Sequence, residues 1–205
     1  MCIMKIYISS LFLLFFTINS FSQNKAFPVQ RNCGTMEHLE YLKSQDPDLE
    51  LRMQNMERNI QHWIDNQGEN ISSIITIPVV VHVVYNNSTE NISDAQIQSQ
   101  ITILNEDFRR LNADASNTPS AFQSVAADCE IEFCLASIDP NGTATTGITR
   151  TQTSVTSFSI SNDAMKSSSS GGIDPWPQDD YLNIWVCDLG GGLLGYATPP
   201  SSWPN

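Results

Sequence analysis

The amino-acid sequence predicts an α/β or α+β domain, in which a largely buried sheet is covered by helices. Three observations lead to this prediction: a β-branched run at 77–85, a capped amphipathic helix from about 94 to 111, and alternating apolar residues at 131–135. The run at 77–85 is apolar on both faces, which is typical of a strand between two layers. The strand–helix–strand order predicts a right-handed crossover between two parallel strands.

The predicted helix over 94–111 has a clear start and a clear apolar stripe. Ser93 and Gln96 occupy the two ends of a capping box, in which side chains satisfy the first free backbone N–H groups. Helical spacing relates the apolar residues behind it, so we expect them to face the sheet. These residues are Ile97, Ile101, Leu104, Phe108 and Leu111.

Further strands are predicted from short apolar runs between turn residues. Residues 139–180 are rich in Ser, Thr, Gly and Pro and read as long surface connections, with a short strand near 148–151. A third strand is predicted at 181–187, and three glycines then turn the chain into a short strand at 193–198. No element is predicted to cover the second face of these strands, so the domain reads as incomplete.

A helical accessory segment over 23–76 precedes the domain. Asp46 and Pro47 are typical of a helix start, and the helix is predicted to run from about 47 to 66 and to end at Gly68. One apolar stripe follows it, formed by Leu49, Met53, Met56, Ile60 and Trp63. Such a stripe is unfavourable in water, so we expect the helix to lie on another surface.

The first 22 residues read as an export signal. Lys5 precedes the apolar run 6–16, and the small residues Ser20 and Ser22 flank Phe21 ahead of the predicted cleavage point. The alternative is a membrane anchor, but the run is only about half as long as a spanning helix. We therefore expect cleavage after Ser22. The mature protein is then expected to be secreted and extracellular, with no membrane partner after the signal is removed.

Composition excludes two classes of partner. The chain has 205 residues, of which 40% are apolar, and carries 10 basic against 22 acidic residues for a net charge of -12. An apolar fraction of this size is sufficient for a packed core. The acidic excess argues against nucleic-acid binding and against a polybasic membrane-surface role.

Three blocks of the sequence resemble a known protease family. They read IPVVVHVVY at 77–85, ILNEDFRRLN at 103–112 and YLNIWVCDLGGGLLGYA at 181–197. In this order they resemble the N-terminal half of the pappalysin (peptidase M43) zinc metalloendopeptidases, especially the secreted bacterial branch. The resemblance covers about 77–198, with a second piece around Cys33.

The resemblance implies a metzincin-like fold, whose upper subdomain is a twisted mixed sheet with two long helices. The second of these helices carries HExxHxxGxxH, which supplies three histidine ligands to zinc and a glutamate as general base. That motif does not occur among these 205 residues. We therefore expect no catalytic residue and no metal ligand of the active enzyme in this chain.

The resemblance also divides the chain into parts. It implies a signal peptide at 1–22, a helical pro-segment at 23–76 and the truncated N-terminal part of the catalytic domain at 77–205. The zinc site is expected downstream of Asn205, and the resemblance also allows for calcium. Zinc-activated water would hydrolyse peptide bonds, so the expected partners are protein or peptide substrates. The alternative is a catalytically dead, truncated secreted module that binds peptides or inhibits a protease.

Cys33, followed by Gly34 and Thr35, is the first candidate site residue. The resemblance implies a cysteine switch, in which the Cys33 thiolate takes the fourth zinc position in the zymogen and excludes the attacking water. Tethering in the same chain raises its effective concentration to about the mM range. The alternative is an ordinary free or disulfide-bonded cysteine.

The segment from Gly190 to Thr198 is the second candidate. The resemblance implies that 193–198 is the antiparallel edge strand of the sheet and the upper rim of a substrate cleft. An extended peptide can add to such an open edge through its backbone. The alternative is a plain turn between two strands. The candidate substrate-binding residues are Gly191, Gly192, Leu193, Leu194, Gly195 and Tyr196.

The histidines and two cysteines receive structural interpretations. His82 lies in an apolar strand without a companion ligand, so we expect a hydrogen-bonded core histidine, and we treat His38 and His62 as incidental. The strand order implied by the resemblance places Cys134 and Cys187 on strands flanking the first one, roughly 9.6 Å apart. That separation is beyond disulfide reach, so we predict that these two do not pair.

Overall fold

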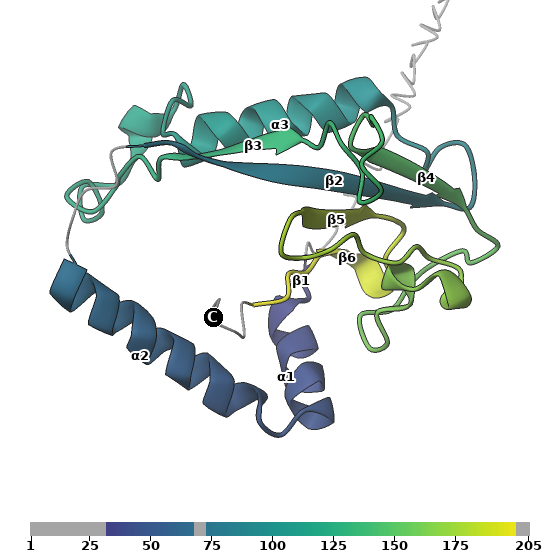
Figure 1. The fold of residues 1–205 in the computed structure, drawn as a ribbon, viewed down its shortest axis with the longest axis horizontal. Coiled ribbons are helices and arrows are strands. Elements are labelled where there is room, and N and C mark those ends of the chain that lie inside the picture. The colour runs from purple at the N-terminus through teal and green to yellow at the C-terminus, as the bar shows by residue number, and fades with distance from the viewer. Residues whose placement is uncertain (1–31, 68–72, 200–205) are drawn as a thin grey trace, which may run out of the picture. The chain divides into compact units, whose positions relative to one another are not determined.

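The computed structural model describes residues 32–67 and 73–199 (Figure 1). The predicted signal peptide at 1–22 and the predicted helix end at Gly68 lie outside these residues. None of the helices in the described ranges combines the length and the apolarity needed to cross a membrane.

A four-stranded parallel sheet forms around one long strand, β2 (Ile75–Tyr85). Its three partners are β3 (Ile131–Leu135), β4 (Ile148–Gln152) and β5 (Leu182–Val186), each parallel to β2. The strand–helix–strand prediction of a parallel pair is therefore confirmed. The prediction of a mixed sheet is wrong for the described residues, because every pairing of named strands in them is parallel.

Backbone hydrogen bonds show on which edge of β2 each partner lies. Residues 81–83 pair with both β4 and β5, so these two strands lie on opposite edges. The N–H of Ala136 donates to the carbonyl of Val79, and the N–H of Val81 donates to the carbonyl of Gly147. Alternate residues of a strand point their backbone groups to one edge. β3 and β4 therefore share an edge, and β5 occupies the other.

Helix α3 (Asp94–Phe108) lies along one face of the sheet (Figure 1). The hydroxyl of Ser93 accepts a hydrogen bond from the N–H of Gln96 at 3.2 Å, which confirms the predicted N-cap. The side chain of Asn105 ties the helix to β3 by bonding both backbone groups of Phe133, at 2.7 and 3.0 Å. The core between helix and sheet consists of Val79, Val81, Val83, Ile97, Ile101 and Phe133.

The second face of β2 is also covered, which the sequence analysis did not predict. Val80, His82 and Val84 are buried there, and Val84 packs with Phe158 and Met165. The latter two belong to the Ser/Thr/Gly/Pro-rich stretch, which folds back onto the sheet instead of staying on the surface. Short 3-10 turns shape the loops at Ala115–Asn117, Ala164–Lys166, Ser168–Ser170 and Gly190–Gly192.

Two helices precede β2, namely α1 (Thr35–Gln45) and α2 (Leu49–Gln67). The second corresponds to the predicted helix, and its start is stabilised by the Asp46 carboxylate, which accepts from the N–H of Asp48 at 3.2 Å. The expectation that its whole apolar stripe is buried is wrong. Leu49 is 6% exposed, but Trp63 at the far end is 42% exposed, because only the start of α2 is folded against α1.

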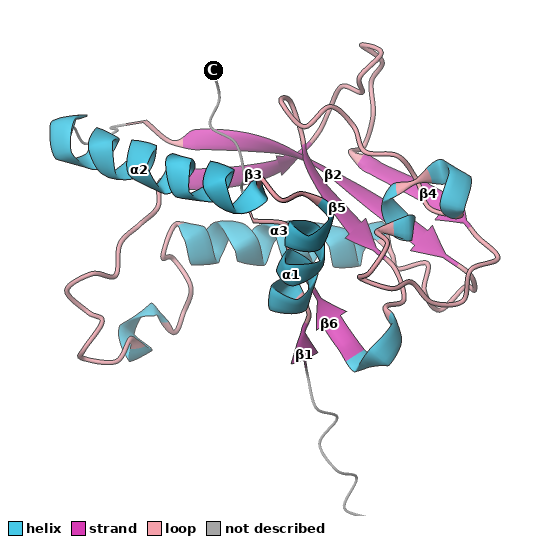
Figure 2. Ribbon diagram, turned by 90° about the horizontal axis from the view of Figure 1, so that it is seen from below, coloured by secondary structure: helices cyan, strands magenta, loops and turns pink. Residues whose placement is uncertain are grey.

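A second, two-stranded sheet pairs β1 (Asn32–Cys33) with β6 (Leu193–Gly195) in parallel (Figure 2). The expectation that 193–198 forms the antiparallel edge of the main sheet is therefore wrong. β6 is shorter than predicted, and its partner among the described residues is a segment about 160 positions earlier in the chain. A strand edge pairs with whichever backbone is close enough, and here the N-terminal segment provides it.

Candidate functional site

The pairing of β1 with β6 brings together the two segments that the sequence analysis selected independently. Asn32 lies opposite Leu193, and Cys33 lies opposite Gly195. The N–H of Gly34 donates to the carbonyl of Gly195 at 2.9 Å and extends the ladder by one bond. The backbone edge assigned to an incoming peptide is thus engaged by this chain's own segment.

Thr35 links the Cys33 sulfur to the strand on the other side. Its hydroxyl oxygen accepts from the N–H of Ala197 at 3.0 Å and lies 3.2 Å from Sγ of Cys33. Since the oxygen is already an acceptor, its own proton is available to the sulfur. Hydrogen bonds from the Thr35 side chain and backbone lower the pKa of the exposed Cys33 thiol. The site therefore increases the thiolate fraction relative to an ordinary cysteine, and the thiolate is the form that attacks electrophiles and binds metals.

Gly34 allows the segment to lie close to its neighbours. An added Cβ there would lie 3.2 Å from Cδ1 of Ile160 and 3.3 Å from Cδ2 of Leu193. Both distances are shorter than ordinary van der Waals contact, so an added Cβ would require the ends of these two side chains to shift slightly. The backbone at Gly34 thus packs closely against two apolar side chains, those of Ile160 and Leu193.

The predicted substrate-binding residues divide into two groups. Leu193, Gly195 and Tyr196 contact the N-terminal segment, whereas Leu194 is 67% exposed and faces away from it. Gly191 and Gly192 are both at φ +72°, a left-handed conformation that glycine adopts without strain. These two glycines therefore form the turn before β6, and their role is to set the backbone conformation there.

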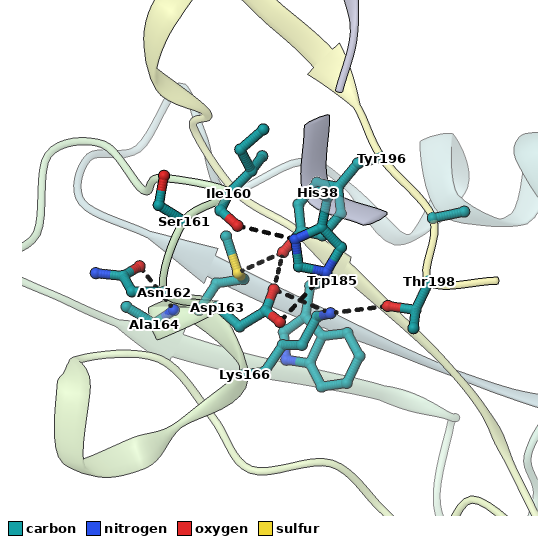
Figure 3. A network of polar contacts seen from close by, with 12 residues as sticks. His38, Ile160, Ser161, Asn162, Asp163, Ala164, Lys166, Trp185, Tyr196 and Thr198 are labelled. Atoms are coloured by element: carbon teal, nitrogen blue, oxygen red, sulfur yellow. Dashed lines mark hydrogen bonds and ion pairs between the residues drawn. The ribbon is translucent and has the colours of Figure 1, made fainter. Parts of the chain in front are cut away.

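His38 is a residue of the site that sequence reasoning missed (Figure 3). It lies in α1 and is fully buried. Its Nδ1 donates to the carbonyl of Ile160 at 2.8 Å, its Nε2 lies 3.4 Å from Oδ2 of Asp163, and its ring lies 4.5 Å from that of Tyr196. The interpretation of His38 as incidental is wrong. Nothing in the local sequence distinguishes it, because its partners are more than 120 positions away.

Asp163 connects the contacts beneath His38. Its Oδ1 accepts from the hydroxyl of Tyr196 at 2.5 Å and lies 3.1 Å from Nζ of Lys166. Burial and the adjacent carboxylate raise the pKa of Tyr196, so its hydroxyl remains protonated. Asp163 itself is at φ +50°, in the left-handed region that few residues other than glycine adopt. Lys166 also reaches Oγ1 of Thr198, at 3.3 Å.

The other candidate residues have structural roles. His82 is fully buried, with Nδ1 2.7 Å from Oγ1 of Thr149 and Nε2 2.9 Å from Oδ1 of Asn183, which confirms the prediction of a hydrogen-bonded core histidine. β3 and β5 lie on opposite edges of β2, and within the described ranges Cys134 and Cys187 are free, in agreement with the prediction that they do not pair.

The described residues do not form a site for zinc. In residues 32–67 and 73–199, no three His, Cys, Asp or Glu side chains gather so that they could hold a metal ion. Cys33 is one candidate ligand, and catalytic zinc needs three protein ligands with an open position.

A wide, open hollow lies beside β5 and β6, with a volume of about 1110 Å³. Its lining combines apolar side chains such as Ile184 and Val186 of β5 with Tyr196 and Lys166 of the site described above. Ile184 and Val186 are only half-buried. This part of the sheet therefore has apolar surface that is available to a further element or to a ligand.

Comparisons with known proteins point in one direction. No model of a known protein family matches the chain, and no curated protein matches it. Solved structures do match, and three of them have TM-scores between 0.56 and 0.71. Promirolysin mutant E225A of Tannerella forsythia is 53% identical, with a TM-score of 0.71, over 82% of this chain and 54% of that chain.

Two mirolysin structures match over shorter stretches. Mature mirolysin of Tannerella forsythia in complex with a cleaved peptide is 64% identical, with a TM-score of 0.60, over 62% of this chain and 47% of that chain. Mirolysin in complex with compound 9 is 64% identical, with a TM-score of 0.56, over 58% of this chain and 44% of that chain.

The chain thus spans about half the length of the solved structures it matches. Identities of 53–64% are well above the level at which only the fold is shared. The three neighbours support a shared fold over the matched part of this chain, and the proprotein neighbour matches the larger share of it.

Proposed function

We propose that this chain is the front portion of a secreted zinc metalloendopeptidase of the pappalysin type, made as a latent zymogen. In this proposal a signal peptide at 1–22 is followed by a pro-segment at 23–76 and by the first part of the catalytic domain at 77–205. The metal ligands and the catalytic base belong to the remainder of the catalytic domain, downstream of Asn205. The substrates are extended peptides.

The observation that carries the proposal is the difference in coverage between the promirolysin match and the mature mirolysin match. The match covers 82% of this chain for promirolysin and 62% for mature mirolysin with a cleaved peptide, a difference of 20% of 205 residues, or about 41 residues. A stretch of that size fits within the proposed pro-segment. The described part ahead of β2 contains β1, α1 and α2. We assign the additional match to these elements.

The contacts of β1 support a blocking role for the segment. The β1 backbone pairs with β6, and the Gly34 N–H adds a bond at 2.9 Å to the Gly195 carbonyl. A peptide that joined this edge would need the same backbone groups. The pairing therefore excludes a peptide from β6 for as long as the segment stays in place. Cys33, the last residue of β1, has a lowered thiol pKa. It is the proposed ligand to zinc in the zymogen.

Peptide substrates are proposed on two grounds. Mature mirolysin was solved in complex with a cleaved peptide. In this chain, β6 supplies a short strand edge next to a turn of glycines that carry no side chain. Gly191, Gly192, Leu193, Leu194, Gly195 and Tyr196 are therefore the proposed substrate-binding residues.

The test begins with the gene downstream of Asn205. We expect an in-frame HExxHxxGxxH, and we expect the extended protein to bind one zinc ion and to cleave peptides after removal of the pro-segment. Cys33→Ala should release activity in the uncleaved protein, whereas Cys129→Ala, at another exposed free cysteine, should leave it latent.

Two outcomes would contradict the proposal. A stop codon directly after Asn205 in a stable natural product would favour the non-catalytic peptide-binding or inhibitory module. An extended protein in which Cys33→Ala and Cys129→Ala are equally latent would remove the cysteine switch while leaving the protease itself intact.

A further inference from the structure

The imidazole of His38 in α1 is fully buried against the loop that follows β4 (Figure 3). The helix α1 that carries it contributes two buried side chains, those of His38 and Leu39. β1, by contrast, has two residues, and both are exposed. A two-residue ladder is too short to hold a segment in place by itself. The attachment of the segment to the domain therefore depends on α1.

The pocket around His38 presents oxygen acceptors to both ring nitrogens. The Ile160 carbonyl, 2.8 Å from Nδ1, has no proton to give, so Nδ1 must carry the hydrogen. Nε2 lies 3.4 Å from Oδ2 of Asp163 and has no hydrogen-bond partner within the described residues. A ring that carries hydrogen on both nitrogens satisfies both acceptors, whereas a ring with one N–H leaves a buried nitrogen facing a carboxylate.

The surrounding groups leave one carboxylate oxygen for the ring. Oδ1 of Asp163 already accepts from the Tyr196 hydroxyl at 2.5 Å and faces the Lys166 ammonium at 3.1 Å. Oδ2 faces His38. The Tyr196 ring lies 4.5 Å from the imidazole and the Tyr41 ring lies 6.0 Å from it, so two aromatic rings bound the pocket. The pocket therefore matches a flat ring with opposed N–H donors.

We propose that Ile160, Asp163 and Tyr196 form a binding site for an imidazole side chain, and that His38 is its ligand and the anchor of the N-terminal segment. The identification of that segment as a pro-segment rests on the proposed function, but the binding site itself does not. In the zymogen, His38 would be a second latch, separate from Cys33 and attached to the loop that follows β4. Loss of the Cys33 ligand would weaken latency, and complete detachment of the segment would also require the release of His38.

The test is chemical rescue in the full chain, followed by amide hydrogen exchange in α1. His38→Ala should accelerate exchange in α1 by about tenfold or more, because one hydrogen bond and a buried ring are lost. Imidazole at tens of millimolar should slow the exchange again by filling the vacated space. The blocked analogue 1-methylimidazole, which cannot donate from both nitrogens, should restore little or nothing.

Two matched variants and one internal reference complete the design. Asp163→Asn should accelerate α1 exchange while His38 is present, and it should remove the preference for imidazole over its blocked analogue in the His38→Ala background. His62→Ala, at an exposed histidine of α2, should change nothing. Exchange in α3 reports that the domain itself remains folded.

Unchanged α1 exchange in His38→Ala would overturn the proposal. Equal rescue by imidazole and 1-methylimidazole would also overturn it, because the pocket would then be a space to fill and not a site that recognises two donors. Neither readout depends on peptidase activity. If the chain passes this test but the protein proves not to be a protease, only the proposed function is refuted. The binding site for His38 would then stand.

Discussion

Replacing His82 by glutamine should change the pH dependence of stability in a predictable direction. Burial lowers the pKa of His82, with a smaller opposing contribution from the hydrogen bond to Asn183. In the unfolded chain the same imidazole titrates near its ordinary value of about 6.5. Below that pH the unfolded state binds a proton that the folded state does not, so the free energy of unfolding falls as the solution is acidified.

The geometry explains why the folded state resists protonation. Nε2 donates to Oδ1 of Asn183 at 2.9 Å, so in the neutral ring Nδ1 is the acceptor for the hydroxyl of Thr149 at 2.7 Å. The neutral ring thus has both nitrogens satisfied. A second proton would convert Nδ1 into a donor in a fully buried site. One proton of difference between the two states gives a slope of at most about 1.4 kcal/mol for each pH unit.

The assay is urea unfolding followed by tryptophan fluorescence, for which Trp185 is a local reporter with its ring 5.1 Å from that of His82. Between about pH 6.5 and pH 5.5 the wild-type chain should lose up to about 1.0 kcal/mol relative to His82→Gln, since the unfolded imidazole is only half protonated at the start of this range. The variant loses hydrogen bonds at every pH, so the slope and not the absolute stability is the readout. His62→Gln, at an exposed histidine, should keep the wild-type slope. Parallel lines for the wild type and His82→Gln would refute the reasoning.

Three further predictions concern reactivity and packing. At neutral pH, iodoacetamide should modify Cys33 well before Cys187, as followed by peptide mass spectrometry, because hydrogen bonds from the neighbouring threonine lower the thiol pKa of Cys33 and burial raises that of Cys187 to about 11. Ile101→Ala should destabilise the domain by about 2–5 kcal/mol in urea unfolding, because it opens a cavity between α3 and the sheet, while Ile103→Ala, 49% exposed, should have an effect within about 0.5 kcal/mol. Gly172→Ala should lower the melting temperature by several degrees, since its Cβ would lie 2.2 Å from the backbone oxygen of Met165.

Elements with a strong local signal could be predicted from the sequence. The β-branched run predicts β2. The capping box and the apolar stripe behind it predict α3, and the cap at Ser93 is present as expected. The alternation at 131–135 gives β3, and the intervening helix makes its pairing with β2 parallel. In these cases the information is contained within a few adjacent residues.

Features determined by distant contacts could not be predicted. The Ser/Thr/Gly/Pro-rich stretch has no periodicity, yet Phe158 and Met165 within it cover the second face of the sheet. The strand β6 does not join the sheet, because its partner is determined by which backbone comes near and not by its own composition. The orientation implied by the family resemblance was therefore wrong for this strand.

The candidate site was predicted in part. Cys33 and the strand at 193–195 were both selected, but nothing in their local sequences indicated that they would lie side by side. His38 was missed for the same reason. Its role comes from Ile160 and Asp163, which are more than 120 positions away. Only a three-dimensional arrangement reveals that a histidine beside the cysteine motif occupies a built pocket.

The most direct test of the account is whether Cys33 lies opposite Gly195. Neighbouring strands are about 4.8 Å apart, which is within the Cα separations that disulfides span. An added Cβ at Gly195 meets no atom within 4 Å among the described residues, so Gly195→Cys should be tolerated. Under mild oxidation it should form an intramolecular disulfide with Cys33, identified by peptide mapping, whereas Leu194→Cys, on the exposed alternate position, should not. Equal cross-linking of both variants, or none at Gly195→Cys, would show that the N-terminal segment does not lie on this strand.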